Sequence, residues 1–301
     1  MTPDQPPETV EAAADYLLER FGGHAAALMA YGSRVCGRAR TGSAFDFWLI
    51  VRDGEAFHRD NAEFYRTQLN VPSTPDEQVR LNRSGPLFYA VKPHGVEVKF
   101  AVVAERTFVA LCRAPWWTVK GRMQKPLRVL RSTPAVDEAL LDARREGARC
   151  AVNLVRREFT LTEFLHELVG LSYRAEIRPE RKRAKIHSIL EAGRVELEEI
   201  YVPLIEALSF VETQRTGYMD MRSREERAAG RRATLRALRR SKWSMRSMKF
   251  VWRNYRSHRS PIRYMVRKLL GEIEKLLRRR SKRPPATDAA PDAPQRPSDA
   301  P

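Results

Sequence analysis

The sequence has no apolar run that approaches the roughly 20 residues needed to cross a bilayer, and it has only three cysteines in 301 residues. Cys36, Cys112 and Cys150 lie far apart, without a CxxC pair or a nearby histidine. Such spacing argues against a structural zinc site and against a disulfide framework. We therefore expect no membrane-spanning helix, no structural zinc and a reducing compartment.

Acidic residues are scarce in one region, and this makes the region strongly basic. Between Arg222 and Arg283 the sequence has 23 Lys and Arg against 4 Asp and Glu, a net charge of +19, while the whole chain carries +18. The rest of the chain is therefore close to neutral. A basic appendage on a neutral body is typical of a module that binds an anionic partner.

Aromatic and apolar residues recur at helical spacing within this basic segment, which predicts an amphipathic helix on an anionic membrane surface. The residues expected to contact the membrane are Trp243, Trp252, Arg253, Arg256, Arg263 and Lys268. Two alternatives stay open. The apolar stripe packs against the rest of the chain, or the basic residues bind nucleic acid.

The periodicity along the chain predicts an α+β fold in four parts. Residues 1–130 show strand and helix patterns and predict a domain with a mixed sheet and flanking helices. Residues 131–221 show helical periodicity alone and predict a helical domain. Residues 222–283 form the basic amphipathic segment, and the Pro- and Ala-rich residues 284–301 are expected to be disordered.

The stretch Tyr31–Asp53, YGSRVCGRARTGSAFDFWLIVRD, carries the strongest chemical signal. One strand ends in Gly32-Ser33, and the next places Asp46 among apolar residues. Glycine permits close approach of the backbone, and a hydroxyl can bond a phosphate oxygen. A carboxylate on the neighbouring strand can hold Mg²⁺ against those phosphates. Because a lone buried carboxylate is costly, we interpret Asp46 as a metal ligand rather than a structural aspartate.

This layout resembles the polymerase-β-like nucleotidyltransferase superfamily, in which metal-held carboxylates position a nucleoside triphosphate for in-line attack at its α-phosphate. That superfamily usually has a second acid two residues after the first, where this chain has Trp48. A third acid is expected on a later strand, and Glu97 is the local candidate. The residue-based alternative for Glu97 is the solvent side of a half-buried strand.

Further blocks resemble the mitochondrial translocator assembly and maintenance family, peripheral CTP:phosphatidate cytidylyltransferases that make CDP-diacylglycerol. The blocks are YGSRV, AFDFWLIVRD, GPLFYAV, HGVEVKFAVV, WWTVKGRMQKPLRVL, LVGLSYRAEIR and RAKIHSIL, in this order between residues 31 and 190. The GRMQKPL match is the most distinctive. The family also has an apolar residue at the position of Trp48, so the missing second acid is no sign of an inactive enzyme. It has an apolar residue where this chain has Glu97.

The resemblance implies a Mg²⁺-dependent enzyme with CTP, phosphatidate and an anionic membrane surface as partners. Gly32 and Ser33 would cradle the nucleotide phosphates, and Asp46 would bind Mg²⁺; Glu97 as a second metal ligand rests on the superfamily layout alone. The residues expected to act in catalysis are Asp46, Lys99 and Lys125, and those expected to bind nucleotide with Gly32 and Ser33 are Arg122, Tyr173 and Arg178. We expect His58 to be structural, and Lys92 and Lys120 to lie on the surface.

Two other functions stay open. One is a nucleotidyltransferase that acts on an RNA end or a small-molecule acceptor, and the other is an inactive nucleotide-binding regulatory protein. The first 21 residues lack the pattern of a secretory signal or a mitochondrial transit peptide. This predicts a bacterial relative of the family, peripheral at the cytoplasmic face of the inner membrane, with an organelle membrane as the alternative.

Overall fold

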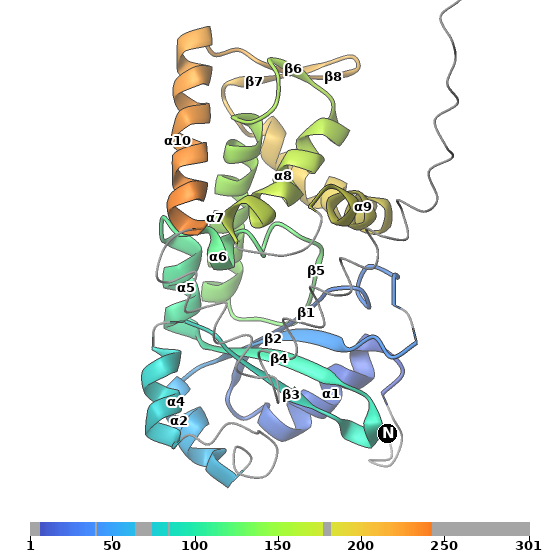
Figure 1. The fold of residues 1–301 in the computed structure, drawn as a ribbon, viewed down its shortest axis with the longest axis vertical. Helices are drawn as coiled ribbons and strands as arrows, with labels where there is room; N and C mark the ends of the chain where they lie inside the picture. The colour runs from blue at the N-terminus through green and yellow to red at the C-terminus, as the bar shows by residue number, and fades with distance from the viewer. Residues whose placement is uncertain (1–6, 40, 64–73, 84, 177–181, 243–301) are drawn as a thin grey trace, which may run out of the picture.

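The computed structural model describes residues 7–39, 41–63, 74–83, 85–176 and 182–242. Its first half is built on a five-stranded sheet in the order β3-β4-β2-β1-β5 (Figure 1). The strands are β1 (Ala25–Tyr31), β2 (Phe45–Val51), β3 (Leu87–Val91), β4 (Val98–Ala104) and β5 (Leu127–Arg131). β2 and β4 are parallel, and the other neighbours are antiparallel. The predicted mixed sheet is therefore confirmed.

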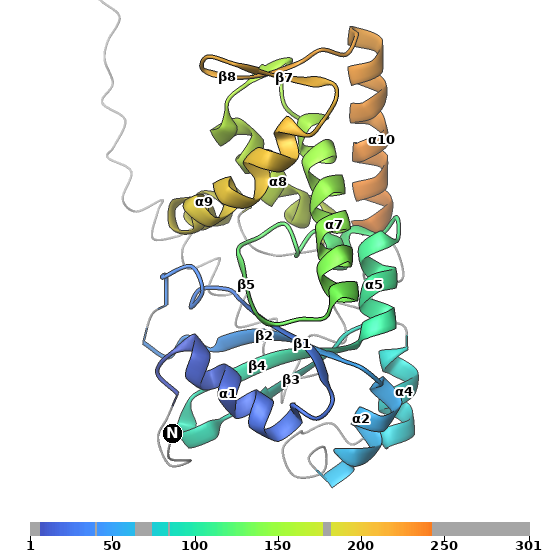
Figure 2. The ribbon, with the colours of Figure 1, turned by 180° about the vertical axis from the view of Figure 1, so that it is seen from behind.

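Helices cover both faces of this sheet (Figures 1 and 2). α1 (Val10–Phe21) begins after Thr9, whose hydroxyl accepts the Ala12 amide, and it packs on the face that carries Phe45, Phe47 and Leu49. The opposite face, with Trp48 and Ile50, packs under α5, α6 and α7. The remaining elements of this half are α2 (Gly54–Asp60), α4 (Pro75–Asn82), the 3₁₀ turn η1 (Pro93–Gly95), α5 (Glu105–Arg113) and α6 (Trp117–Lys120).

The second half is mainly helical, as expected. It contains α7 (Pro134–Val152), α8 (Leu161–Ala175), α9 (Lys182–Glu206) and α10 (Arg224–Lys242). It also contains a three-stranded sheet in the order β6-β8-β7, from β6 (Glu158–Phe159), β7 (Val211–Gln214) and β8 (Gly217–Asp220), which the sequence did not predict. These strands are two to four residues long, so they are too short to show a period of two.

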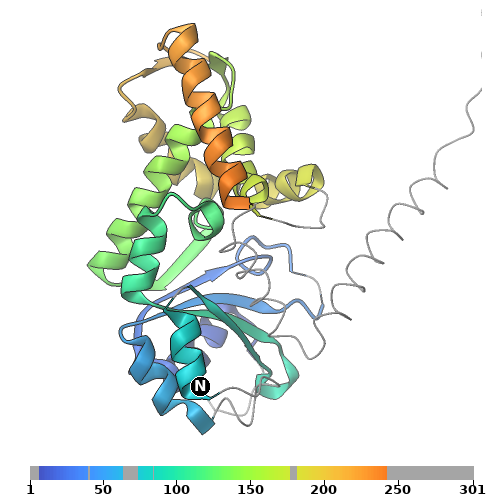
Figure 3. The ribbon, with the colours of Figure 1, turned by 60° about the vertical axis from the view of Figure 1, so that its left-hand side comes forward.

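α10 is the described part of the predicted basic segment. Its inner side buries Thr234, Leu238 and Ser241, and the Ser241 hydroxyl accepts the Trp117 amide at 2.9 Å. Figure 3 shows α10 running along the helical half down to α6. In the described ranges no helix combines the length and the apolar character of a membrane span. The six residues expected at the membrane, Trp243, Trp252, Arg253, Arg256, Arg263 and Lys268, lie outside the described residues.

The block Gly121–Pro126, GRMQKP, joins the two halves. A Cβ atom on Gly121 would lie 2.9 Å from the Ser172 Cα of α8, so the two backbones are in close contact. At the other end of the block, a Cβ atom on Gly193 would lie 2.4 Å from the Pro126 ring. Gly193 has non-helical angles and bends α9 at this contact. The most distinctive sequence block thus lies between the sheet and the helices α8 and α9.

Gln124 is the buried centre of this junction. Its side-chain amide donates to the carbonyl oxygens of Lys120 and Ala143 at 2.7 and 3.0 Å, and its oxygen accepts from the Tyr201 hydroxyl at 2.7 Å. Fully paired buried polar groups fix a single arrangement of the elements that carry them. The hydrogen bonds of Gln124 therefore tie α7 and α9 to the turn before β5.

Lys120, expected on the surface, is completely buried, so that expectation was wrong. Its ammonium pairs with Glu146 of α7 and lies 5.3 Å from the centre of the Trp117 ring. A partner carboxylate and an aromatic face offset the cost of burying the charge. The residues around Lys120 give no sign of this partner, because Glu146 lies 26 positions further along the chain. Lys92 is exposed, as expected.

We predict that Gly147→Ala destabilises the protein. A Cβ atom on Gly147 would lie 1.9 Å from Gln124 Oε1 and displace the central amide. Alanine normally stabilises a helix by about 1 kcal/mol relative to glycine, whereas this overpacked site should lose about 1–3 kcal/mol. Chemical denaturation measures the difference. Gly23→Ala is the control, because its Cβ would meet no atom within 4 Å; an unchanged or higher stability of Gly147→Ala contradicts the described packing.

Candidate active site

Asp46 lies on the sheet face that the helical half covers, between two strands. Its register partners are Tyr31 on β1 and Lys99 on β4. Asp46, Trp48 and Ile50 share this face because alternate residues of a strand point the same way. Trp48 is fully buried and packs against Phe108 of α5, with ring centres 6.3 Å apart. The position of the superfamily's second acid therefore belongs to the hydrophobic core of this chain.

Gly32 brings its backbone against the Asp46 carboxylate. Its φ of +92° lies in the left-handed region, which glycine adopts without strain. A Cβ atom on Gly32 would lie 2.7 Å from Asp46 Oδ2. The expected pairing of a glycine loop with a strand aspartate is thus present, and any other residue at position 32 would fill the space beside the carboxylate.

Burial raises the pKa of the Asp46 carboxyl from 3.8 to about 6, because water that would stabilise the charge is excluded. The positive charges of Lys99, Arg122 and Lys185 act against this rise, and the negative charge of Glu97 adds to it. Four charged side chains therefore act on the Asp46 carboxylate, two of them from the sheet half outside the helices and two from the junction block and α9.

Glu97 and Lys99 lie two residues apart on the same side of the chain, next to Asp46, and form an ion pair at 3.2 Å. Each side chain is about one-third exposed, at 33% for Glu97 and 34% for Lys99. Mg²⁺ in phosphate-transfer sites binds one or two carboxylates, and water and substrate oxygens complete its shell. Asp46 and Glu97 fit this requirement, since a cation between them would relieve their mutual repulsion. In the described part of the chain no cluster of three His, Cys, Asp or Glu side chains could hold a metal by itself.

Arg122 is held by Glu176, the residue that ends α8. The guanidinium donates to the two carboxylate oxygens at 3.0 and 3.3 Å, and Glu176 is 2% exposed. Arg122 also lies 5.9 Å from the centre of the Phe88 ring on β3. Bidentate pairing fixes the plane of a guanidinium. Glu176 thus positions the charge of Arg122 above the β3–β4 side of the site.

Lys125 and Tyr173, both expected to act at the site, are brought together. The Lys125 ammonium lies 4.5 Å from the centre of the buried Tyr173 ring, a cation–π contact between the junction block and α8. Arg178, the other residue expected to bind nucleotide, lies outside the described residues. His58 is buried between α2 and α4 beside Asn82, and burial lowers its pKa to about 4. This position agrees with the structural role expected for His58.

The loop after Gly32 contains two arginines to which the sequence analysis gave no role. Arg34 donates from two nitrogens to the Ser43 carbonyl oxygen at 3.1 and 3.0 Å and lies 4.3 Å from the centre of the Phe45 ring. It closes the loop that carries Ser33. Arg38 reaches across to the Ser188 hydroxyl on α9. Both arginines lie within the stretch Tyr31–Asp53 singled out from the sequence, but only the fold shows what they contact.

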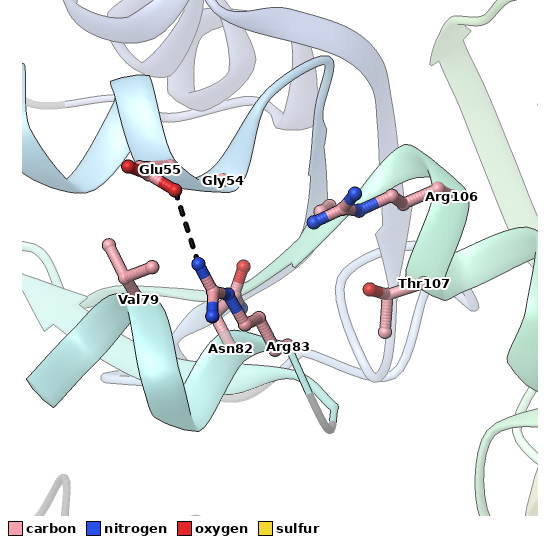
Figure 4. A pocket seen from close by; sticks show the side chains of 8 residues that line it. Gly54, Glu55, Val79, Asn82, Arg83, Arg106 and Thr107 are labelled. Atoms are coloured by element: carbon pink, nitrogen blue, oxygen red, sulfur yellow. Dashed lines mark hydrogen bonds and ion pairs between the residues drawn. The ribbon is translucent and has the colours of Figure 1, made fainter. Parts of the chain in front are cut away.

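A small pocket lies at the other end of the parallel strands, where β2 leads into α2 and β4 into α5 (Figure 4). Its wall includes Gly54, Asn82 and Arg106, and the ion pair of Glu55 with Arg83 at 3.3 Å crosses it. None of the residues predicted to act in catalysis lines this pocket. The candidate active site is the charged group around Asp46, where Gly32, Glu97, Lys99 and Arg122 come together.

We predict that Asp46→Asn stabilises the metal-free protein above pH 6. The pKa of Asp46 is higher in the folded chain than the unfolded value of 3.8, so the folded state loses stability as pH rises from about 4 to about 6. Asparagine keeps the shape and removes the charge, and the gain should be about 1–3 kcal/mol at pH 7.5. Denaturation in EDTA at pH 7.5 and pH 4 measures it. A gain at pH 4 equal to that at pH 7.5 would contradict the electrostatic cause.

The chain is similar to known proteins of one family. The sequence profile of the family described as "Phosphatidate cytidylyltransferase, mitochondrial" matches residues 14–272. Curated proteins with that name are similar to the chain. The one from Caenorhabditis elegans is 27% identical over 170 residues, which is 53% of this chain and 53% of that protein. The one from Drosophila melanogaster is 24% identical over 195 residues, which is 57% of this chain and 54% of that protein. The chain thus spans about half the length of the curated relatives it matches, and because the profile covers most of its residues, it belongs to the mitochondrial phosphatidate cytidylyltransferase family.

Proposed function

We propose that the protein is a Mg²⁺-dependent phosphatidate cytidylyltransferase that makes CDP-diacylglycerol and pyrophosphate from CTP and phosphatidate. The observation that carries the proposal is the charged group of Asp46, Glu97, Lys99 and Arg122 next to the left-handed Gly32. The names of the matched relatives supply the substrate class. The relatives are matched over about half of their length, so the complete activity is part of the proposal.

In the proposed reaction, a phosphate oxygen of phosphatidate attacks the α-phosphorus of CTP. A new P–O bond forms, the bond between the α-phosphorus and the bridging oxygen breaks, and pyrophosphate leaves with the bond electrons. A phosphate monoester has a second pKa near 6 and is largely deprotonated at pH 7. No general base is therefore required.

The residues of the chain orient the phosphates and neutralise their charge. Gly32 leaves room for a phosphate beside Asp46, and Ser33 can donate its hydroxyl to a phosphate oxygen. Lys99, Arg122 and Lys125 provide fixed positive charge for the triphosphate and the leaving pyrophosphate. Asp46 and Glu97 would hold Mg²⁺, which supplies Lewis-acid stabilisation of phosphate charge when bound.

α10 supports the proposal that the protein works on a membrane surface. Its solvent side presents a row of exposed arginines, Arg232, Arg236, Arg239 and Arg240. Among the described residues, no carboxylate forms an ion pair with these four. Basic residues near an anionic leaflet contribute about 1 kcal/mol each to binding. The names of the relatives include the word mitochondrial, which favours the organelle membrane over the bacterial inner membrane.

The activity test uses phosphatidate vesicles, Mg²⁺ and each of four radiolabelled nucleoside triphosphates. We expect label from CTP to enter the lipid and EDTA to abolish the transfer. Asp46→Ala should reduce it by more than about a hundredfold, because loss of even an outer-shell partner of a metal site costs 10–100-fold. Asp137→Ala, at an exposed position on α7, is the control. A folded wild-type protein that labels no lipid would disprove the proposal and favour an RNA end or a small-molecule acceptor.

The membrane test compares two triple variants in co-sedimentation with vesicles of phosphatidylcholine and cardiolipin. Arg232, Arg236 and Arg240 changed to Gln should weaken binding by about tenfold or more, as three charges leave the surface. The control changes three exposed cations of the sheet half, Arg80, Lys92 and Arg106, to Gln. Equal losses of vesicle binding in both variants would indicate that binding depends on total charge and not on α10. No loss in the α10 variant would exclude α10 from the membrane contact.

A further inference from the structure

Two cations, Arg38 and Lys185, are left unused by the proposed triphosphate contacts. The sheet order places β4 on one side of β2 and β1 on the other. Lys99 is on β4, and Arg122 lies over Phe88 of β3, so both belong to the β4 side. Arg38 belongs to the loop that joins β1 to β2, and Lys185 belongs to α9, which this loop contacts.

Arg38 connects the loop to α9. Its guanidinium donates to the Ser188 hydroxyl, 150 residues further along the chain. Its Nε atom is buried and has no hydrogen-bond partner among the described residues. A buried N–H without an acceptor carries a desolvation cost, which an anionic ligand would remove. A phosphate oxygen is a suitable acceptor, because guanidinium groups bind phosphates with several parallel hydrogen bonds.

Lys185 lies one helical turn before Ser188, so the two side chains lie on the same side of α9. This places Lys185 on the side that meets the Arg38 loop. The contact of Gly193 with Pro126 fixes the middle of α9 against the junction block. The charge of Lys185 acts on Asp46 and on Cys36, a residue of the same loop as Arg38. Lys185, an exposed residue of the helical half, therefore contributes positive charge to the reacting centre.

An in-line transfer needs two separate anion sites. The entering and leaving oxygens lie on opposite sides of the α-phosphorus, so the acceptor phosphate cannot occupy the place of the leaving pyrophosphate. Lys99 and Arg122 provide positive charge for the pyrophosphate on the β4 side. Arg38, on the loop after β1, and Lys185, on α9, carry positive charge that these contacts leave to an acceptor.

We propose that Arg38 and Lys185 bind the phosphate monoester of the acceptor, and that α9 thereby selects a phosphate rather than an alcohol as the nucleophile. This assignment rests on the proposed function. It also gives α9 a part in the reaction: the nucleotide is held by the sheet and the junction block, and the acceptor is held against it by Arg38 of the loop after β1 and Lys185 of α9.

The experiment measures initial rates with dioctanoyl phosphatidate below its micelle concentration, so that membrane binding does not enter. Lys185→Gln should raise the KM for dioctanoyl phosphatidate about tenfold, the usual effect of losing one charge-assisted contact, with the KM for CTP changed less than about twofold. Lys185→Arg should restore most of the affinity. The matched control is Arg183→Gln, an equal loss of charge at an exposed position on the opposite side of α9, which should leave both KM values within about twofold.

Two results would overturn the assignment. A rise in the KM for CTP alone would place Lys185 at the triphosphate, and unchanged KM values would remove it from substrate binding. If the wild-type protein forms no CDP-diacylglycerol, the proposed function fails, and calorimetric titration with dioctanoyl phosphatidate tests the phosphate site by itself. Weaker binding to Lys185→Gln than to Arg183→Gln would then still support the site, and equal binding would disprove it.

Discussion

Asp46 lies on a strand whose other residues on both faces are apolar, and the free-energy cost of keeping its carboxylate charged there determines the arrangement around it. The sheet alone provides one neighbouring cation, Lys99, and this lysine is already paired with Glu97. The other cations come from the turn before β5 and from α9. The positive charges that partly offset the cost of burying this carboxylate therefore come from both halves of the chain.

The junction block Gly121–Pro126 connects the charges near Asp46 with the helices of the second half. Successive residues of GRMQKP face different elements: Gly121 faces α8, Gln124 faces α7 and α9, and Pro126 faces the bend of α9. Between them, Arg122 and Lys125 are held by Glu176 and Tyr173 of α8. In this short segment, residues that pack against α7, α8 and α9 alternate with charged residues. The positions of the helices therefore also fix the positions of the charges, which is a physical reason why so many motif residues lie in one turn.

The sequence predicted the sheet half well, because strands buried on both faces are strongly apolar and the spacing from Gly32 to Asp46 is specific. It assigned Lys125 and Tyr173 to one site through resemblance to a family and not through spacing, and the structure brings the two side chains into contact. The sequence did not predict β5, an edge strand with only Leu127 buried, or the burial of Lys120 beside Glu146. It gave Arg38 and Lys185 no role, because α9 and the loop after β1 come together only in the folded chain. Local periodicity carries no information about such a contact.

The parallel register of β2 and β4 has a consequence for how members of the family can diverge. Asp46 lies beside Lys99 because two strands, separated by the residues 52–97, are aligned without a bulge. Insertions or deletions within the intervening segment leave this alignment intact, since only the strands define it. A single-residue deletion inside β2 would instead turn every side chain before it to the opposite face, which would send Asp46 into the core under α1 and bring Phe45 or Phe47 out beside Lys99. Length variation among relatives should therefore concentrate between the strands and away from β3 and Glu97, where it changes the outline of the molecule without changing its chemistry.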